Sequence, residues 1–249
     1  MNEELLASLE EEGYRGRVVG VEHLRDLEVE LEERRRQGLI DEDLYEEYLA
    51  GFGFDLPEDL PLGESLILVA MPQPQIQVVF TLNGKALPLI VPPTYLHARE
   101  SDKRVEDLLR EILAVDGYRV AAAAVPKKAL AVHSGLGAYG RNNICYVSGM
   151  GSFVRLVAFY SDLPGEEDEW RELTAMEACE KCTACLRVCP TGAITDERFL
   201  IRAERCLTFL NEKPGDVPFP AWVDPSWHNC PVGCMLCQKM CPENRDVVD

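Results

Sequence analysis

Nine of the ten cysteines of this 249-residue chain lie between Cys179 and Cys241, and their spacing is typical of iron–sulfur chemistry. The segment CEKCTACLRVCP has the spacing C-x2-C-x2-C-x3-C-P. Where a chain holds two [4Fe–4S] clusters, the first three cysteines of this pattern bind one cluster and the fourth ligates the other. A second segment, GCMLCQKMCP, follows the first, and Cys206 lies between the two.

Counting ligands predicts two clusters, because two [4Fe–4S] clusters need eight thiolates. The crossed pattern assigns one cluster to Cys179, Cys182, Cys185 and Cys241, and the other to Cys189, Cys206, Cys234 and Cys237. Cys230 has no predicted role. Zinc is the weaker alternative, because tetrahedral zinc sites favour paired C-x2-C segments. Ten cysteines without a secretion signal also favour metal or redox chemistry over disulfides.

Residues 1–165 contain the elements that must position this chemistry, and 166–249 form a predicted second domain. Apolar periodicity and turn signals predict strands interleaved with helices. The expected helices are 3–12, 23–37, 41–50, 102–115 (capped by Asp102) and 127–133. The expected strands are 17–21, 65–71, 118–125 and 153–160, with a hairpin at Asn83-Gly84. We expect an α+β fold, an α/β sandwich, joined to the cysteine-rich domain by the acidic run 166–172.

The formal net charge of −18 is concentrated near the amino terminus, where residues 1–60 carry a net charge of −13. A strongly acidic chain repels phosphate backbones, so nucleic acid is disfavoured as a partner. Most of these acids are expected to lie on solvated helix faces. The sequence has neither a membrane-spanning apolar run nor a secretion signal, which predicts a cytoplasmic protein.

The chain resembles the epoxyqueuosine reductase family and, more distantly, the reductive dehalogenases. The segments that carry the resemblance extend over most of the chain: EEGYRGRVVGVEHL, ERRRQG, PLGESLILVAM, HSGLGAYGRNN, GSFVRLVAFYSDLP, CEKCTACLRVCPTGAI, RCLTFL and GCMLCQKMCPEN. The resemblance implies a nitroreductase-like first domain that binds cobalamin, and a ferredoxin-like second domain that supplies electrons. It places a glycine-rich loop near the corrinoid, formed by Gly135, Leu136, Gly137, Gly140, Arg141 and Asn142. Without the resemblance, this glycine cluster would indicate an ordinary turn.

The chain departs from the tRNA-modifying members of that family in three respects. Those members carry an aspartate in an Asp-x-Ala-Pro segment, whereas residues 120–133 contain no acid. They usually continue into a helical-repeat tail, whereas this chain stops soon after Cys241. Their substrate is tRNA, which the net charge disfavours. Any of Tyr95, His97, His133, Tyr139 and Tyr146 could supply protons instead, although a structural role is the simpler expectation for each.

These observations predict a redox protein whose two [4Fe–4S] clusters pass electrons to a corrinoid or to a small substrate. The expected partners are an electron donor such as ferredoxin or flavodoxin and a small molecule or a redox protein. One alternative is an electron carrier or reductive activator that docks on a partner enzyme through its acidic amino-terminal region. The other is a tRNA epoxyqueuosine reductase. The sequence identifies no catalytic residue and no substrate.

Overall fold

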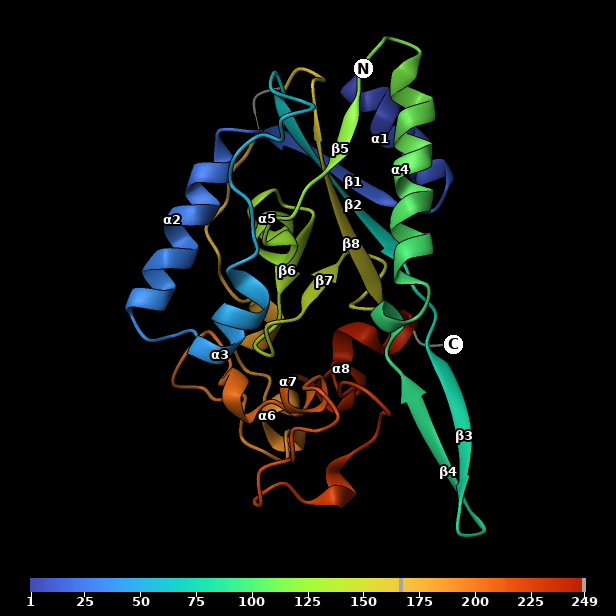
Figure 1. Ribbon diagram of the computed structural model, residues 1–249, viewed down its shortest axis with the longest axis vertical. Coiled ribbons are helices and arrows are strands. Elements are labelled where there is room, and N and C mark those ends of the chain that lie inside the picture. Colours follow the sequence, from blue (N-terminus) through green and yellow to red (C-terminus); the bar gives the residue numbers. More distant parts are fainter. Residues whose placement is uncertain (166–167, 248–249) are drawn as a thin grey trace.

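The computed structural model describes residues 1–165 and 168–247, so the first two residues of the predicted acidic linker lie outside it. A four-stranded antiparallel sheet forms the upper part of the molecule (Figure 1). Its order is β1 (Arg15–Gly20), β2 (Ser65–Pro72), β8 (Val154–Ser161) and β5 (Val120–Ala122). The cysteine-rich segments lie below the sheet.

The strand β2 is covered on both faces, as its continuous apolar run predicts. Because successive side chains of a strand point to opposite faces, Leu66 and Leu68 enter one apolar core and Ile67 and Val69 enter the other. All four side chains are fully buried. The sheet is therefore the middle layer of a sandwich.

Helices from distant parts of the chain cover the two faces. The helices α1 (Asn2–Glu11) and α4 (Ala98–Ala114) pack on the face that holds Ile67 and Val69. The helices α2 (His23–Arg36) and α5 (Lys127–His133) cover the other face. The predicted α+β class is confirmed, while the nitroreductase-like detail stays a prediction.

The start of α4 differs from the prediction, because the helix begins at Ala98 and not after Asp102. His97, with φ of 52°, takes the left-handed conformation before the first turn. Asp102 lies within the helix and accepts a hydrogen bond of 2.6 Å from Arg155 Nη2 on β8. The carboxylate that was predicted as a cap therefore ties the helix to the sheet.

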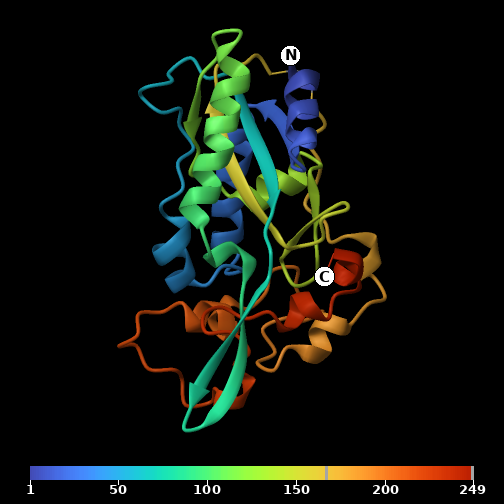
Figure 2. The ribbon, with the colours of Figure 1, turned by 90° about the vertical axis from the view of Figure 1, so that its right-hand side faces the viewer.

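The predicted hairpin is confirmed as β3 (Ile76–Leu82) and β4 (Lys85–Val91), which Figures 1 and 2 show as an arm projecting from the body. Asn83 and Gly84 both have positive φ, as the tight two-residue turn requires. The arm pairs with no strand of the central sheet. A short 3-10 turn, η2 (Pro93–Tyr95), then leads to α4.

The cysteine-rich region has short helical turns and little other regular structure. These are η3 (Glu177–Cys179), α6 (Ala184–Val188), η4 (Ala203–Arg205), α7 (Leu207–Asn211), η5 (Pro225–Trp227), α8 (Leu236–Lys239) and η6 (Pro242–Val247). The helices α6 and α8, which belong to different cysteine segments, pack together. Two smaller pieces lie between this region and the sheet. One is α3 (Glu42–Leu44) with its continuation η1 (Tyr45–Leu49), and the other is the strand pair β6 (Gly137–Tyr139) and β7 (Cys145–Val147). No helix in the described ranges is long and apolar enough to span a bilayer.

Candidate functional site

One group of cysteines combines both cysteine segments. Burial raises the pKa of Cys179, a hydrogen bond from the Arg141 backbone N–H opposes that rise, and the neighbouring thiolates of Cys241 and Cys182 add to it. Burial likewise raises the pKa of Cys185, and the charges of Cys179 and Cys182 raise it further. Cys241 of the second segment is thus a neighbour of Cys179, as the crossed assignment requires.

A second group forms around Cys237. Burial raises the pKa of its thiol to about 12, with further contributions from the charges of Cys206, Cys234 and Cys189. These are the four cysteines assigned to the other cluster. No three His, Cys, Asp or Glu side chains of the described ranges converge on a point where one ion could bind.

Cys230 lies close to the second group but in a different environment. Its side chain is buried in a small apolar cluster with Phe153 and Met235, and its Sγ donates a hydrogen bond of 3.0 Å to Asn229 Oδ1. Burial raises its pKa to about 11. The Asn229 amide in turn donates to Cys234 Sγ at 3.3 Å. Asn229 therefore connects Cys230 to a predicted ligand.

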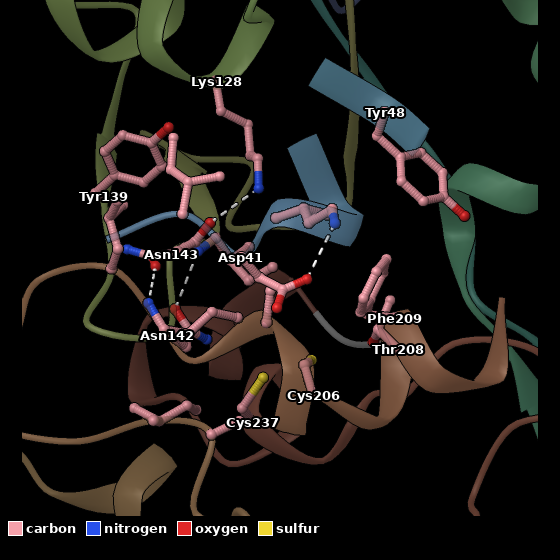
Figure 3. Close-up of a pocket in the computed structure, with 18 of the residues that line it drawn as sticks. Asp41, Tyr48, Lys128, Tyr139, Asn142, Asn143, Cys206, Thr208, Phe209 and Cys237 are labelled. Atoms are coloured by element: carbon pink, nitrogen blue, oxygen red, sulfur yellow. Dashed lines mark hydrogen bonds between the residues drawn. The ribbon is translucent and has the colours of Figure 1, made fainter. Parts of the chain in front are cut away.

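A cavity of about 680 Å³ lies between the sheet layer and the cysteine-rich region. Figure 3 shows Cys206 and Cys237 below it, Lys128 above it, and Tyr48 and Phe209 at one side. All four cysteines of the second group line this cavity, and none of the first group does. The two groups therefore occupy unequal positions, one at the cavity and one beyond it.

The upper wall of the cavity carries two adjacent lysines from the first turn of α5. Burial lowers the pKa of both Lys127 and Lys128. The side chain of Lys128 is surrounded by protein, and the part of its surface that solvent can reach faces the cavity. Its Nζ donates a hydrogen bond of 3.2 Å to the Asn143 carbonyl. Cations at a helix amino terminus oppose the macrodipole, so this placement does not favour the helix itself. Neither lysine was predicted as a site residue, although their position in AAAAVPKKAL was a usable signal.

Two asparagines connect the cavity wall to the cysteine-rich region. Asn142 is buried, its amide nitrogen donates to Tyr146 Oη at 3.0 Å, and its side chain also contacts the thiol of Cys237. Asn143, with φ of 53°, donates to the Phe199 carbonyl at 2.9 Å and accepts from the Ile201 N–H at 2.5 Å.

In the glycine-rich loop, one residue lines the cavity and the others make contacts elsewhere in the protein. Of its six predicted cofactor residues, only Asn142 lines the cavity. Leu136 belongs to the apolar core, and the Arg141 guanidinium donates to the Cys179 carbonyl at 2.6 Å, beside the other cysteine group. A Cβ on Gly137 would lie 2.6 Å from Cys145 Sγ, and one on Gly140 would lie 2.6 Å from the Tyr146 ring. A Cβ on Gly135, whose φ is +71°, would lie 2.7 Å from the Arg171 guanidinium. These three glycines are therefore accounted for by packing within the protein.

The five side chains considered as proton donors also divide into those that line the cavity and those that do not. Tyr95 and Tyr139 line the cavity, whereas His97, His133 and Tyr146 do not. His133 is held between Glu30, at 2.7 Å, and the Arg171 carbonyl, which is a structural arrangement. Burial raises the pKa of Tyr139 beyond the range in which it could exchange a proton near neutrality.

Glu212 is an acidic residue of the cavity wall that the sequence analysis missed. It follows α7 directly, and its carboxylate accepts a hydrogen bond from the Tyr95 hydroxyl. Burial raises its pKa. Lys213, the next residue, turns away to pair with Glu47 and Asp43.

Some acids of the amino-terminal region form ion pairs within the protein. On α2, Arg34 pairs with Glu30 and Arg36 pairs with Glu33, each one turn away. The pairs that Lys213 forms with Glu47 and Asp43 join η1 and α3 to the cysteine-rich region. These contacts use acids of this region inside the molecule, while its role as a docking surface stays a prediction.

Comparison with protein families identifies the cysteine-rich region. Residues 178–244 match the model of a 4Fe–4S double cluster binding domain. This match confirms two [4Fe–4S] clusters as cofactors of this region and supports the oxidoreductase class. Which cysteine binds which cluster stays a prediction.

Comparison with curated proteins confirms the resemblance to epoxyqueuosine reductases. The chain is 36% identical to the epoxyqueuosine reductase of Escherichia coli K12 over 146 residues, which are 57% of this chain and 37% of that protein. It is 34% identical to that of Pseudomonas aeruginosa over 149 residues, which are 57% of this chain and 40% of that protein. The chain thus matches well under half the length of these relatives.

Solved structures share the fold over almost the whole chain. A crystal structure of a selenomethionine-labelled epoxyqueuosine reductase matches 99% of this chain and 66% of that one, with a TM-score of 0.69 and 22% identity. The Bacillus subtilis reductase, solved with a catalytic aspartate loop swung out of its active site, gives a TM-score of 0.67 at 23% identity, over 99% of this chain and 66% of that one. A catabolic reductive dehalogenase matches 75% of this chain and 26% of its own, with a TM-score of 0.51 and 16% identity.

Proposed function

We propose that the protein is an iron–sulfur reductase in which two [4Fe–4S] clusters supply electrons to a cofactor held in the 680 Å³ cavity. The observation that carries this proposal is the unequal placement of the two cysteine groups. Cys189, Cys206, Cys234 and Cys237 line the cavity, while the group around Cys179 lies outside it. Such an arrangement gives electrons an entry at one group and an exit into the cavity at the other.

A corrinoid is the proposed cofactor, and the wall residues fit it. The cavity volume lies within the range of cofactor pockets, and most of its wall is apolar, as a large macrocycle requires. Asn142, Asn143, Lys127 and Lys128 line the cavity and would supply polar groups to hydrogen-bond the amide side chains of a corrin ring. When bound, a corrinoid would supply a strongly reducing metal centre that the clusters can recharge by single electrons.

The chain's own residues would bind and orient this group. Lys128 is held by the Asn143 carbonyl, and Asn143 is itself fixed by two hydrogen bonds to the segment 199–201. The upper and lower walls are therefore joined at one point. Tyr48 and Phe209, in edge contact with ring centroids 6.0 Å apart, form one side of the cavity.

Epoxyqueuosine in tRNA is the substrate best supported by the comparisons. The curated relatives named above are epoxyqueuosine reductases, and one structure of the same fold was solved with an epoxyqueuosine-modified tRNA stem loop. On the sequence alone, this substrate ranks behind a small molecule, because the absence of the Asp-x-Ala-Pro aspartate and the net charge of −18 are among the departures that point the same way. The similarity favours the tRNA substrate over that first choice.

A small-molecule substrate is the second candidate, and one observation favours it. The segment that precedes α5 contains four alanines, Ala121 to Ala124, and no acid. A catalytic aspartate loop is named for the Bacillus subtilis relative. A chain without that carboxylate needs another proton source, or a different reaction.

The test uses the full chain, purified without oxygen and reconstituted with iron and sulfide. Cobalamin is added, unbound cofactor is removed by gel filtration, and the absorption spectrum reports what stays bound. The loaded protein is then incubated with a strong one-electron reductant and with tRNA from cells lacking epoxyqueuosine reductase. Mass spectrometry of the digested tRNA measures conversion of epoxyqueuosine to queuosine.

We expect about eight irons per chain, retained cobalamin, and queuosine in the product. Lys128→Ala should weaken cobalamin retention, whereas Lys181→Ala, an exposed lysine away from the cavity, should not. Loss of cobalamin from the wild-type protein on gel filtration would refute the corrinoid proposal. Retained cobalamin without conversion of tRNA would instead favour the small-molecule substrate.

A further inference from the structure

The reductive reaction proposed above needs protons as well as electrons. A substrate that takes up two electrons also takes up two protons, or stays charged in a cavity with mainly apolar walls. The segment before α5, with its four alanines, offers no carboxyl group for this purpose. A proton donor must therefore come from another part of the wall.

We propose that Glu212 is the catalytic acid of the cavity and that Tyr95 is the residue that positions it. Glu212 lines the cavity from the cysteine-rich region, and Tyr95 lines it from η2, which is distant in the sequence. The hydroxyl of Tyr95 donates a hydrogen bond to the Glu212 carboxylate. This inference rests on the reductase function proposed above.

The surroundings of Glu212 favour a carboxyl group that keeps its proton. No Lys or Arg of the described ranges forms an ion pair with it, because Lys213 turns to Glu47 and Asp43. Tyr48, on η1, is the other titratable group that faces it, and the Glu212 charge contributes to the raised pKa of Tyr48. Burial at an apolar wall without a cationic partner raises the pKa of Glu212, although the hydrogen bond from Tyr95 favours the ionised form. A raised pKa brings a carboxylic acid closer to the range in which it can donate a proton near neutral pH.

The position of Tyr95 is closely determined by its neighbours. A Cβ on Gly233, whose φ is +69°, would lie 3.0 Å from the Tyr95 hydroxyl. The Gly233 carbonyl accepts a hydrogen bond of 3.2 Å from Asn211, the residue before Glu212. The hydroxyl therefore lies between the chain at Gly233 and the carboxylate at Glu212, where it can orient that carboxylate toward the cavity.

The proton balance of the proposed step is simple. An external one-electron donor protein supplies two electrons in turn, and the clusters pass them to the reaction. The Glu212 carboxylic acid gives one proton to the reduced substrate and becomes a carboxylate. Water that enters the cavity supplies the second proton and later reprotonates Glu212.

The test compares Glu212→Gln, Tyr95→Phe and a control, Glu46→Gln, in the protein loaded with both clusters. The side chain of glutamine still accepts the Tyr95 hydrogen bond but cannot donate an acidic proton, so the fold should be preserved. Glu46 is an exposed carboxylate on η1 that does not line the cavity. The first readout is the infrared band of a protonated carboxylic acid at pH 6 to 8, which does not depend on turnover.

We expect that band in the wild-type protein and in Glu46→Gln, and its loss in Glu212→Gln. We also expect kcat of Glu212→Gln to fall by about 10²-fold or more with little change in KM. Tyr95→Phe should shift the pH at which the band disappears and should shift the pH–rate profile with it. A glutamate that is fully ionised at pH 6, or a Glu212→Gln variant with wild-type kcat, would overturn the proposal. Failure of the reductase function itself would be recognised separately, as a wild-type protein that shows the band but reduces no substrate.

Discussion

The imidazole of His23 and the indole of Trp170 stack face to face, with ring centroids 3.9 Å apart and an interplanar angle of 3°. His133 stacks on the other face of the indole at 4.4 Å. Each histidine is fixed in turn by a carboxylate, His23 by Asp168 at 2.9 Å and His133 by Glu30 at 2.7 Å. The chain that leads to the cysteine-rich region is thereby fastened to α2 and α5 of the sheet domain.

Replacing Trp170 with alanine should destabilise the protein by about 2 kcal/mol, since a half-buried aromatic ring and two stacking contacts are lost. Chemical denaturation of the cluster-loaded protein measures the change in the free energy of unfolding. Trp222→Ala is the matched control, because 44% of Trp222 is exposed, and it should cost less than about 1 kcal/mol. Equal effects of the two substitutions would contradict a fastening role for the stack.

The cysteine assignment predicts unequal effects of two neighbouring substitutions. Cys237→Ser should lower the iron content from about eight to about four per chain, since one cluster loses a ligand. Cys230→Ala should keep about eight irons, because its thiol packs with Phe153 and Met235. Iron and acid-labile sulfide are measured after anaerobic reconstitution. Loss of four irons from Cys230→Ala would instead make Cys230 a ligand.

Arg141 should tune the group of cysteines outside the cavity. Its backbone N–H lies 3.4 Å from Cys179 Sγ, and its guanidinium donates to the Cys179 carbonyl. Removing this positive charge in Arg141→Gln should move the potential of the adjacent cluster to a more negative value, by about 1 kcal/mol per electron or a few tens of millivolts.

The potentials are measured by redox titration followed by electron paramagnetic resonance. Arg187→Gln is the control, since Arg187 is exposed and donates to the Thr183 hydroxyl. Its effect should be smaller than that of Arg141→Gln. An unchanged potential in Arg141→Gln would mean that Arg141 has only a structural role.

The stability of the wild-type protein should fall as the pH rises above 4.5, in part because of Glu212. Its pKa in the folded protein is raised above the ordinary value of 4.5, so between the two values the folded protein binds more protons than the unfolded chain. The contribution to stability is therefore complete below pH 4.5 and is lost as the pH rises through the folded pKa. Because the carboxyl is partly exposed, the loss should stay below about 1 kcal/mol.

Thermal unfolding of the cluster-loaded protein at several pH values measures this effect. Glu212→Gln carries no titrating carboxyl, so its Tm should depend less on pH than that of the wild type, and should match or exceed it at pH 8. Glu46→Gln should follow the wild type. A Glu212→Gln variant with the same pH dependence as the wild type would show that Glu212 is ionised in both states.

Local sequence signals predicted the elements that depend only on their own residues. The apolar run at β2, the Asn83-Gly84 turn and the helix Lys127–His133 are all present where the sequence indicated. The pairing of β6 with β7 was missed, because each strand has only three residues and its partner is identified by tertiary packing. The start of α4 was misplaced because Asp102 has the residue type of a cap but binds Arg155 on another element.

The functional site likewise combines features that local sequence determines with features that tertiary packing determines. The spacing of the cysteines predicted a double cluster domain, since spacing is a local property. The cavity could not be predicted, because its wall joins α2, η1, η2, α5 and α7, which are far apart in the sequence. Glu212 carries no motif, and only the approach of Tyr95 from another part of the chain marks it as unusual.

In the predicted ligand sets, Cys189 of the first segment joins cysteines of the second, and Cys241 of the second joins cysteines of the first. This crossing has a consequence for biosynthesis. Each cluster takes cysteines from both segments, so neither can be completed while only the first has left the ribosome. Each ligand set would then be completed only after the second segment has been translated, one at Cys237 and the other at Cys241.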